Sequence, residues 1–596
     1  MKLSDYVIQY LVDKGIQDIF LVSGGGIMHL LDSVGRNPVM KYYCNNHEQA
    51  CAVAAEGYAR LTGKPGVCMA TVGPGASNAL SGILSAWTDS LPLIVLAGQV
   101  RQDLIADYGK LRQFGPQEAN TIAMARPVTK YAISIRDPKM VRYEMDRAWH
   151  EATSGRPGPV WVEFPLDVQS AIIDENQLIG YVNPQSANES ALVAQVCEVI
   201  NALRTSKRPI LVAGNGIRIS GSLELFKTLL DQSKIPLVLP FTAKDLLEEE
   251  HPRNIGIFGT AGQRRANFAV QNCDCLVSLG AGLNCQKLGF NFKGFAPNAK
   301  KIIVEIDQHQ LFDQAIKPDL AIQCDVKDFL AEFLRQTELM PIDTSPKWVD
   351  ACADWKLRYP LITPDYFENT EYVNSYVFMD KLSDALLPED IIIAGAGSDA
   401  PSWYQAFKAK TGQRSMCSAW GSMGWDLPLS IGACVGGGMR RTICVTGDGS
   451  IQWNIQELLT IARSHLPIII FILNNRGYTS IRATQNNFFE GRYVGADHNS
   501  GLANPDFQKL AEAYGLPYFY IGTNAELADG LKSVLAVNKA AICEVNLAED
   551  QSISPKASAF RHPDGTFESR PLEDMSPFLS REEVYENMHL FDEESA

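Results

Sequence analysis

Two side chains in the last third of the chain offer oxygen atoms at a spacing that could hold a metal ion. Asp448 lies in a glycine-rich run directly after an apolar stretch, and Asn475 follows a second apolar stretch 27 positions later. The turn after Asn475 adds a backbone carbonyl oxygen, which we assign to Gly477. A carboxylate, an amide oxygen and a carbonyl oxygen are hard ligands that suit Mg²⁺, which keeps its other positions for water and phosphate oxygens. The sequence therefore predicts a metal site formed by Asp448, Asn475 and Gly477.

Further residues of the same run fit a diphosphate group beside this metal. Glycines let the backbone approach phosphate oxygens closely, and a helix N-terminus beyond them favours negative charge. A glycine-rich turn with a capping aspartate is the plainer alternative, and the second oxygen ligand at a matched spacing disfavours it. The residues assigned to the diphosphate here are Gly447, Gly449 and Ser450.

The elements around these residues must bring them to one place. The apolar runs 442–446 and 468–473 each end at one of the predicted ligands, and a helical pattern spans 455–464 between them. In a parallel strand–helix–strand unit, both strands end at the same carboxyl edge of the sheet, where ligands bind. This unit would place Asp448 and Asn475 side by side.

This pattern resembles that of thiamine-diphosphate-dependent enzymes. The resemblance implies that Mg²⁺ and thiamine diphosphate bind at this edge, and that a carboxylic acid activates the aminopyrimidine ring of the cofactor. In this family the acid follows a strand near the start of the chain. Here a strand at 41–44 leads to Glu48 and then to a helix at 52–60. A solvated glutamate at a helix start is the alternative.

The family also binds its cofactor in a bent form, which implies a residue beneath the bend. Met423 is the candidate, and the carbonyl oxygen of Gly421 would accept a hydrogen bond from the cofactor's amino group. Methionine as core filler is the alternative. A segment after the strand at 391–394 would contact the diphosphate from the other side, unless its polar residues only cap the next helix. That segment consists of Gly397, Ser398 and Asp399.

More specifically, residues 1–550 resemble the acetolactate synthases. The resemblance rests on the segments 71–78, 89–93 and 97–100. It implies small residues near the reacting carbon atom and an active-site glutamine, which two inserted residues precede here. A histidine could face the acceptor, with an exposed or capped position as the alternative. The residues assigned in this way are Gly25, Gly26, Gln117 and His29.

Two positions depart from the acetolactate synthase pattern. The family carries a tryptophan that favours a second 2-oxo acid as acceptor, and Thr484 stands in its place. It also carries an arginine implicated in binding the acceptor carboxylate, and Gly282 replaces it. Because a guanidinium fork binds a carboxylate best, both changes predict an acceptor other than a second pyruvate. The tail segment 571–579 resembles family members linked to surface-polysaccharide and branched-sugar synthesis, in which the acyl unit can be delivered to a ketone.

Acetolactate synthases hold FAD in their middle domain, so FAD is a further expected ligand. Here a glycine-rich turn follows a strand at 210–213, and two later segments resemble other flavin-contacting positions. A lone Gly-x-Gly is a weak indication, and a middle domain that is empty or binds another nucleotide is the alternative. The residues assigned to FAD are Gly214, Gly216, Gly259, Thr260 and Asp307.

The alternation of strands and helices predicts the fold class. Short apolar runs, many of them followed by a helical pattern, are typical of parallel sheets that helices cover on both faces. We expect an α/β chain of three consecutive doubly wound parallel-sheet domains: a pyrimidine-binding domain (1–175), a Rossmann-like middle domain (188–340) and a diphosphate-binding domain (370–548). Residues 549–596 form a polar tail that is a candidate lid over the active site.

Composition narrows the class of protein. The 596 residues are 46% hydrophobic and 20% charged, with a net charge of −15, so the surface would repel nucleic acid and anionic membranes. No apolar run is long enough to span a membrane, and the N-terminus lacks the features of a signal peptide. The 13 scattered cysteines are typical of free thiols in a reducing compartment. We expect a cytoplasmic protein without nucleic-acid or membrane partners.

These features together predict an enzyme, a lyase or transferase. We expect thiamine-diphosphate-dependent decarboxylation of a 2-oxo acid, with pyruvate as first choice, and carboligation of the acyl unit to an acceptor ketone or aldehyde. A true acetolactate synthase, a C–C hydrolase or a pyruvate oxidase would share the fold. A cofactor-binding protein without catalysis is disfavoured by the intact Glu48. The resemblance also implies an obligatory homodimer, in which Glu48 of one subunit faces Asp448 of another, and a homotetramer is the expected assembly.

Overall fold

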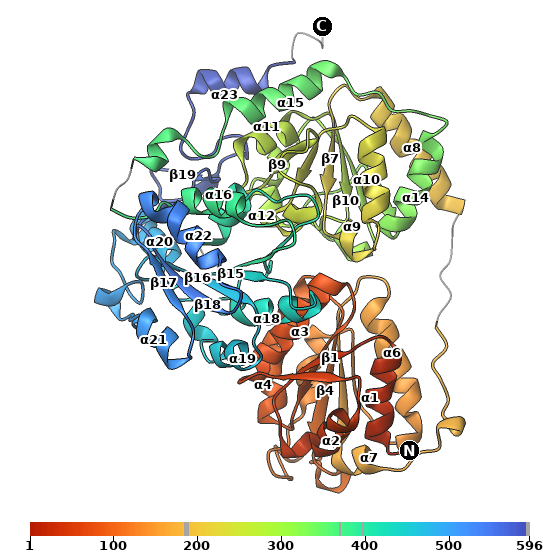
Figure 1. Cartoon of the computed structure of the whole chain (residues 1–596). Helices are drawn as coiled ribbons and strands as arrows, with labels where there is room; N and C mark the ends of the chain where they lie inside the picture. Colours follow the sequence, from red (N-terminus) through yellow and green to blue (C-terminus); the bar gives the residue numbers. More distant parts are fainter. Residues whose placement is uncertain (184–189, 369–370, 396–398, 592–596) are drawn as a thin grey trace.

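The computed structural model describes residues 1–183, 190–368, 371–395 and 399–591. Its long strands form three six-stranded sheets, which follow one another along the chain (Figure 1). Neighbouring strands within each of these sheets run parallel. Helices cover the sheets, which confirms the predicted α/β class with three domains.

The first domain has the strand order β2-β1-β3-β4-β6-β5. Its strands are β1 (Asp18–Leu21), β2 (Lys41–Cys44), β3 (Gly66–Ala70), β4 (Leu93–Gln99), β5 (Tyr131–Ser134) and β6 (Pro159–Pro165). Its helices are α1 (Leu3–Asp13), α2 (Met28–Arg36), α3 (Glu48–Thr62), α4 (Pro74–Thr88), α5 (Thr121–Ala125), α6 (Val141–Thr153) and α7 (Leu166–Ser170).

The middle domain has the order β12-β11-β10-β7-β8-β9. Its strands are β7 (Pro209–Ala213), β8 (Leu237–Leu239), β9 (Asn254–Ile257), β10 (Cys275–Leu279), β11 (Lys300–Glu305) and β12 (Leu320–Gln323). Its helices are α8 (Ser190–Thr205), α9 (Gly216–Ile219), α10 (Leu223–Gln232), α11 (Arg264–Asn272), α12 (Cys285–Leu288), α13 (Gln308–Phe312) and α14 (Val326–Thr337), and α15 (Pro346–Arg358) follows.

The third domain has the order β14-β13-β15-β16-β18-β17. Its strands are β13 (Ile391–Ala394), β14 (Arg414–Met416), β15 (Thr442–Gly447), β16 (Ile468–Asn474), β17 (Tyr518–Ile521) and β18 (Ala541–Asn546). Its helices are α16 (Ser375–Ala385), α17 (Asp399–Ala406), α18 (Asp426–Gly436), α19 (Glu457–Arg463), α20 (Thr479–Phe489), α21 (Phe507–Ala513) and α22 (Leu527–Leu535).

The tail after β18 packs on the middle domain. It contains an antiparallel hairpin, β19 (Ala559–Arg561) and β20 (Phe567–Ser569), and the helix α23 (Arg581–Met588). The side chain of Asn267 in α11 donates to the carbonyl oxygen of Leu572 at 3.0 Å, and the indole of Trp355 in α15 donates to Asn587 at 2.8 Å. The tail is therefore held by the middle domain and by the helix α15 that follows it.

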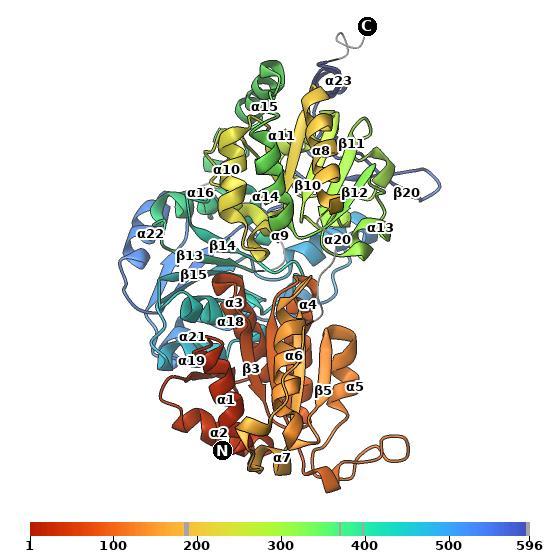
Figure 2. The ribbon, with the colours of Figure 1, turned by 90° about the vertical axis from the view of Figure 1, so that its right-hand side faces the viewer.

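Glycines bring the first and third domains into close contact. α3 and α18 lie side by side (Figures 1 and 2), and a Cβ atom on Gly432 of α18 would lie 1.7 Å from the carbonyl oxygen of Ala54 in α3. A Cβ atom on Gly57 would lie 2.2 Å from the carbonyl oxygen of Leu429. Because the helices touch through their backbones, one hydrophobic core runs from the first sheet into the third.

Candidate cofactor site

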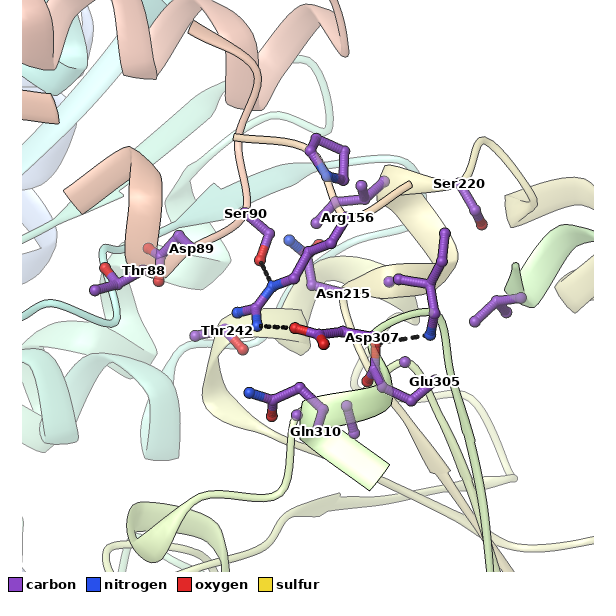
Figure 3. Close-up of a pocket in the computed structure, with 18 of the residues that line it drawn as sticks. Thr88, Asp89, Ser90, Arg156, Asn215, Ser220, Thr242, Glu305, Asp307 and Gln310 are labelled. Carbon is purple, nitrogen blue, oxygen red and sulfur yellow. Dashed lines mark hydrogen bonds and ion pairs between the residues drawn. The ribbon is translucent and has the colours of Figure 1, made fainter. Parts of the chain in front are cut away.

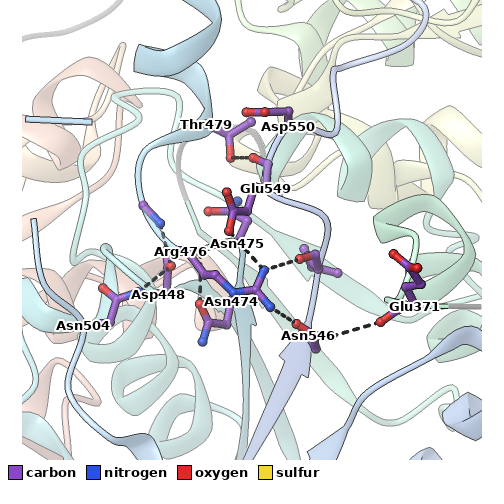
Figure 4. A network of polar contacts seen from close by, with 12 residues as sticks. Glu371, Asp448, Asn474, Asn475, Arg476, Thr479, Asn504, Asn546, Glu549 and Asp550 are labelled. Atoms are coloured by element: carbon purple, nitrogen blue, oxygen red, sulfur yellow. Dashed lines mark hydrogen bonds and ion pairs between the residues drawn. The ribbon is translucent and has the colours of Figure 1, made fainter. Parts of the chain in front are cut away.

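Asp448 and Asn475 lie at the carboxyl edge of the third sheet, each directly after one of two paired strands (Figure 4). β15 and β16 run parallel with Gly447 opposite Leu473, and the N–H of Asp448 donates to the carbonyl oxygen of Leu473 at 3.2 Å. Both residues are buried, with 2% of Asp448 and 6% of Asn475 exposed. The fold brings together the two residues that their spacing singles out, while their role as metal ligands stays a prediction.

The carboxylate of Asp448 is surrounded by N–H donors. One oxygen accepts from the backbone of Gly449 at 2.7 Å, and the other accepts from the backbone of Gly477 at 2.9 Å and from the side chain of Asn504 at 2.7 Å. Burial nevertheless raises the pKa of Asp448, against the lowering by these hydrogen bonds. The ionised carboxylate therefore lacks a full counter-charge, which a bound cation would supply.

The side chain of Asn475 offers a free oxygen at the same place. Its Oδ1 atom is buried and has no hydrogen-bond partner among the described residues. Leaving a buried acceptor unsatisfied costs about 1–3 kcal/mol, so such an atom calls for a partner. The described residues hold no cluster of three or more His, Cys, Asp or Glu side chains suited to a metal. A cation at this edge would therefore be held by one carboxylate together with amide and carbonyl oxygens, the set that Mg²⁺ takes.

The glycines of this edge leave room for close approach. Gly477 has φ +138°, and a Cβ atom there would lie 2.4 Å from the carbonyl oxygen of Ala496. A Cβ atom on Gly449 would lie 2.2 Å from the ring of Tyr478. Part of the glycine requirement thus comes from the packing of the loop itself and not from a ligand.

The helix expected at 455–464 begins later than predicted. A 3₁₀ turn spans Ile451–Trp453, and α19 starts at Glu457. Ser450 Oγ is occupied in the protein, because it donates to Asp426 at 2.9 Å and accepts from the N–H of Gly424 at 2.9 Å. The side chain of Asn454 donates to the carbonyl oxygen of Gly424 at 2.7 Å. These bonds hold the segment that contains Met423 against the glycine-rich turn. The chain from Ser450 to Asn454 is used for these contacts and does not form a continuous helix.

The segment 421–424 is partly open. Gly421 is exposed with φ +68°, a Cβ atom there would meet nothing within 4 Å, and Met423 is half-buried. This arrangement leaves the carbonyl of Gly421 and the side chain of Met423 accessible to a ligand. Of the other predicted diphosphate contacts, Gly397 and Ser398 lie outside the described residues, as does the side chain of Asp399, the first residue of α17.

Glu48 is the first residue of α3, one turn earlier than the helix was predicted to start, and it is 9% exposed. One carboxylate oxygen accepts from the side chain of Asn78 at 3.0 Å. The other would lie 2.9 Å from a Cβ atom on Gly75. The carboxyl group is thus held in one orientation at the carboxyl end of the first sheet.

Glu48 also lies close to the third domain of its own chain. The side chain of Asn454 donates at 3.3 Å to Gln49, the residue after Glu48, and the same amide donates to Gly424, the residue after Met423. One asparagine thereby joins the start of α3 to the segment predicted to lie under the cofactor. The expected meeting of Glu48 with Asp448 of another subunit remains a prediction for the assembled protein.

The other first-domain candidates surround the loop after β3. The N–H of Gly26 donates to Thr71 at 3.0 Å, and the carbonyl oxygen of Gln117 packs so closely on Gly73 that a Cβ atom there would lie 1.6 Å away. Gly25 is exposed, His29 is half-buried in the first turn of α2, and Gln117 is exposed with φ +62°. Gly26 and Gln117 thus pack on the segment after β3, which continues to Gly75 beside Glu48. That these residues act in one site stays a prediction.

A cavity of about 790 Å³ lies between the first and middle domains (Figure 3). Gly216 and Asp307 line it. Gly214 lies behind the wall, since its N–H donates to the carbonyl oxygen of Leu279 and a Cβ atom there would lie 2.2 Å from Gly280. Gly214 is therefore required for packing, and its N–H is not available to a phosphate.

Gly259 and Thr260 are not among the residues that line this cavity. Thr260 donates through its backbone and its hydroxyl to the carbonyl oxygen of Gln286, and its own carbonyl accepts from Ala557 of the tail. Thr260 thus binds the tail to the middle domain. Their predicted contact with FAD would need a ligand that extends beyond the cavity.

An ion pair crosses the cavity from one domain to the other (Figure 3). Arg156 of the first domain donates to Asp307 at 3.0 Å and to the hydroxyl of Ser90 at 2.7 Å. Partial burial acts to raise the pKa of Asp307, but the hydrogen bonds from Arg156 and from the backbone of His309, together with the nearby positive charge of Arg156, outweigh it and lower this pKa. The wall of the cavity thus carries charged side chains that could bind a polar ligand.

Lys287 places a positive charge beside Gly282, where an arginine is missing. Its ammonium donates to the carbonyl oxygens of Ala281 at 2.5 Å and Gly282 at 2.6 Å, and burial lowers its pKa to about 8. Lys287 lines the cavity and is 7% exposed. The loss of the arginine therefore does not leave this region without a cation, although an ammonium lacks the fork geometry of a guanidinium.

Sequence reasoning missed three residues of these sites: Asn504, Asp426 and Lys287. Asn504 lies in a loop after α20, where no spacing connects it with Asp448. Asp426 follows Met423 closely, and its position after a glycine-rich run could have indicated a role in that turn. Lys287 has the neighbours of an ordinary surface lysine, so only the fold reveals its burial.

Three parallel-sheet domains, with a buried carboxylate and an unpartnered amide oxygen at the carboxyl edge of the last one, define a multidomain α/β protein. Three family models match the chain in sequence. The N-terminal TPP binding domain of thiamine pyrophosphate enzymes matches 1–124, their central domain matches 196–333, and their C-terminal TPP binding domain matches 395–545.

Relatives cover nearly the whole chain. A probable acetolactate synthase large subunit of Methanocaldococcus jannaschii is 31% identical over 91% of this chain and 92% of its own length. The large subunits of acetolactate synthase isozymes 1 and 2 of Escherichia coli are each 29% identical, over 93% and 97% of this chain and 95% and 100% of their own lengths. The chain belongs to the acetolactate synthase large-subunit-like family of thiamine pyrophosphate (thiamine diphosphate) enzymes.

The two positions that depart from the family pattern are both accessible. Thr484 is exposed on α20, and its hydroxyl donates to the carbonyl oxygen of Ser480 at 2.9 Å. Gly282 lines the interdomain cavity with φ +54°.

Among the described residues, none of the helices combines the length and the apolar character that crossing a bilayer requires.

Proposed function

We propose that this chain decarboxylates a 2-oxo acid, with pyruvate as first choice, and transfers the acyl unit to the carbonyl carbon of an acceptor ketone or aldehyde. The observation that carries the proposal is the unpartnered Oδ1 atom of Asn475 beside the buried carboxylate of Asp448. In a thiamine pyrophosphate enzyme, such a pair at paired strand ends is suited to hold the metal of the cofactor.

In this proposal each side chain has a stated task. Asp448, Asn475 and the carbonyl of Gly477 would hold Mg²⁺, and Glu48 would share a proton with the aminopyrimidine ring of the bound cofactor. Thiamine diphosphate, when bound, supplies the electron sink that makes loss of CO₂ from a 2-oxo acid feasible. Gln117 would donate to the developing oxyanion, beside the loop 71–73 on which its own carbonyl oxygen packs.

The choice of acceptor rests on Thr484 and Gly282. Threonine on the exposed face of α20 removes the aromatic wall expected for a second 2-oxo acid, and Gly282 removes a guanidinium. Lys287 places an ammonium beside Gly282. An acceptor carboxylate could pair with this charge, but it would lack the bidentate partner that a guanidinium provides. The two replacements together favour a ketone or aldehyde without a carboxylate as the acceptor, with His29 as a candidate to face it.

Acetolactate synthase itself is the second candidate, and the relatives named above favour it. The two candidates differ in what pyruvate alone gives. We would incubate the protein with thiamine diphosphate, Mg²⁺ and ¹³C-pyruvate, alone and with a panel of ketones and aldehydes, and identify products by NMR. Our proposal expects mixed products when an acceptor is present. Efficient formation of 2-acetolactate from pyruvate alone would favour the second candidate, and consumption of O₂ would indicate an oxidase.

We further propose that the interdomain cavity binds FAD or another nucleotide. The support is a volume of about 790 Å³ with Arg156 and Lys287 in its wall, two cations that would complement phosphate oxygens. The test is the absorbance spectrum of the purified protein and of the supernatant after denaturation. A released flavin would support FAD, and a colourless protein that binds added adenine nucleotide would support the other nucleotide.

For the assembly we propose a homodimer as the smallest active unit and a homotetramer as its usual form. Because the relatives are named large subunits, a smaller regulatory subunit is a further partner to test. Size-exclusion chromatography with light scattering, over a range of protein concentrations, measures the assembly. Full activity of an isolated monomer would contradict the dimer.

A further inference from the structure

Arg482 is a buried cation next to the candidate metal ligands, and the proposed function gives it no task. It lies in the first turn of α20, directly after the loop that contains Asn475 and Gly477, and it is 2% exposed. A guanidinium is costly to bury unless its N–H groups find acceptors. The acceptors that it has therefore indicate what it is there to hold.

The guanidinium donates mainly to backbone carbonyl oxygens, two of which belong to the loop 475–477 that contains predicted metal ligands (the metal loop). One terminal nitrogen donates to the carbonyl of Asn475 at 3.0 Å and to the hydroxyl of Thr479 at 3.2 Å. The other donates more weakly to the carbonyl of Arg476 at 3.5 Å and to that of Ala496 at 3.4 Å. The loop that follows β16 and the segment that packs on Gly477 are thus fixed to one planar group.

The same guanidinium reaches the start of the tail. It donates to the carbonyl oxygen of Glu549, and its Nε atom donates to the carboxylate of Asp550 at 3.0 Å. Thr479 also donates to the carbonyl of Glu549, at 3.2 Å (Figure 4). The first turn of α20 is therefore hydrogen-bonded both to the metal loop and to the segment that follows β18.

Asn475 has two oxygen atoms, and among the described residues the bond to Arg482 leaves only the side-chain oxygen free for a metal. Arg482 occupies the main-chain carbonyl of Asn475, whereas the side-chain Oδ1 atom has no partner in the described part of the chain. A planar fork that holds several carbonyls at once fixes their directions, which a flexible ammonium cannot do. The free side-chain oxygen is presented because the backbone behind it cannot rotate.

We propose that Arg482 is a positioning residue for the metal site: it orients the loop 475–477 so that Asn475 Oδ1 and the Gly477 carbonyl converge on the metal held by Asp448. This inference rests on the proposed function of those three residues. Arg482 acts through the backbone and touches neither cofactor nor substrate. Partners behind metal ligands commonly change metal affinity about 10- to 100-fold when they are removed.

The test is Mg²⁺-dependent binding of thiamine diphosphate to the full-length protein, followed by tryptophan fluorescence and by titration calorimetry. We expect Arg482→Gln to raise the apparent Kd for Mg²⁺ about 10- to 100-fold. Arg482→Lys, which keeps the charge and loses the fork, should give a smaller increase. Should Arg482→Gln fail to fold, Arg482→Lys carries the test alone.

Arg441 supplies the matched control at the opposite end of the same sheet. It directly precedes β15, donates through two nitrogens to Asp390 at 2.8 and 2.6 Å and through a third to the carbonyl of Leu535 at 2.8 Å. Arg441→Gln should lower thermal stability without changing the Kd for Mg²⁺. A Kd within twofold of the wild type in a folded Arg482 variant, or an equal increase in Arg441→Gln, would overturn the inference. A wild-type protein that binds no thiamine diphosphate would instead overturn the proposed function beneath it.

Discussion

The backbone N–H of Gly477 donates to the carboxylate of Asp448 at 2.9 Å, and this bond joins the ends of the neighbouring strands β15 and β16. The residue that follows β15 is thus tied to the turn that follows β16. An anion in this position orders the loop after β16 around itself, so Asp448 organises the site in addition to offering a ligand oxygen. Removing its charge should affect both tasks.

Asp448→Asn should abolish metal-dependent retention of thiamine diphosphate, because the amide offers a weaker ligand and a donor where an acceptor is needed. Asn504→Ala removes only one of the donors to this carboxylate and should weaken Mg²⁺ binding about tenfold. Equilibrium dialysis with and without Mg²⁺ measures both effects. Unaltered affinity in Asp448→Asn would contradict its assignment as the anchor.

Mixing two inactive variants tests whether the site is shared between subunits. Glu48→Gln and Asp448→Asn should each be inactive alone. In a randomly reassociated dimer with sites across the interface, about one quarter of all sites would combine an intact Glu48 with an intact Asp448. Activity should therefore return when the variants are dissociated and reassembled together. If the mixture stays inactive although mixed dimers form, each site belongs to one chain.

The buried Lys287 predicts a pH-dependent stability. Its pKa is lowered to about 8, whereas an unfolded lysine titrates near about 10.4. Between these values the unfolded chain binds more protons, so the free energy of unfolding rises with pH. From pH 7.5 to 9.5 the wild type should gain about 2 kcal/mol relative to Lys287→Met. Urea unfolding of both proteins at the two pH values measures this gain, and parallel pH profiles would contradict it.

The contact between α3 and α18 predicts a strong effect of one methyl group. A Cβ atom on Gly432 would overlap the carbonyl of Ala54, so Gly432→Ala should destabilise the protein by about 1–3 kcal/mol. Gly35 in α2 is the matched control, because a Cβ atom there meets nothing within 4 Å. Gly35→Ala should be neutral or stabilising by up to about 1 kcal/mol. Equal unfolding midpoints in urea for the two variants would show that the helices do not touch as described.

Strands are the part of the fold most readily predicted from the sequence. β13 has the predicted bounds, and β7 starts one residue earlier than predicted, because fully apolar runs in a parallel sheet end where the burial ends. The start of α19 is predicted less well, since Asn454 uses its side chain to bind Gly424 and Gln49 and interrupts the helical pattern. Periodicity does not register such a long-range bond.

Some residues of the candidate site could likewise be predicted from the sequence, and others could not. Asp448 and Asn475 are identifiable because both follow strands, whose spacing is fixed by the unit that connects them. Asn504 and Arg482 are not, because their positions depend on how the chain after Gly477 folds back on the sheet edge. Arg482 is buried, and nothing in its local sequence distinguishes it from an exposed arginine.

The central claim is that Glu48 activates thiamine diphosphate for the decarboxylation of a 2-oxo acid. The most direct measurement is release of ¹³CO₂ from [1-¹³C]pyruvate by the wild type and by Glu48→Gln, with saturating thiamine diphosphate and Mg²⁺. We predict release by the wild type and a rate lower by about 10²- to 10⁴-fold in the variant, with cofactor binding retained. Equal rates in the two proteins, or no CO₂ from the wild type with any 2-oxo acid, would contradict the account.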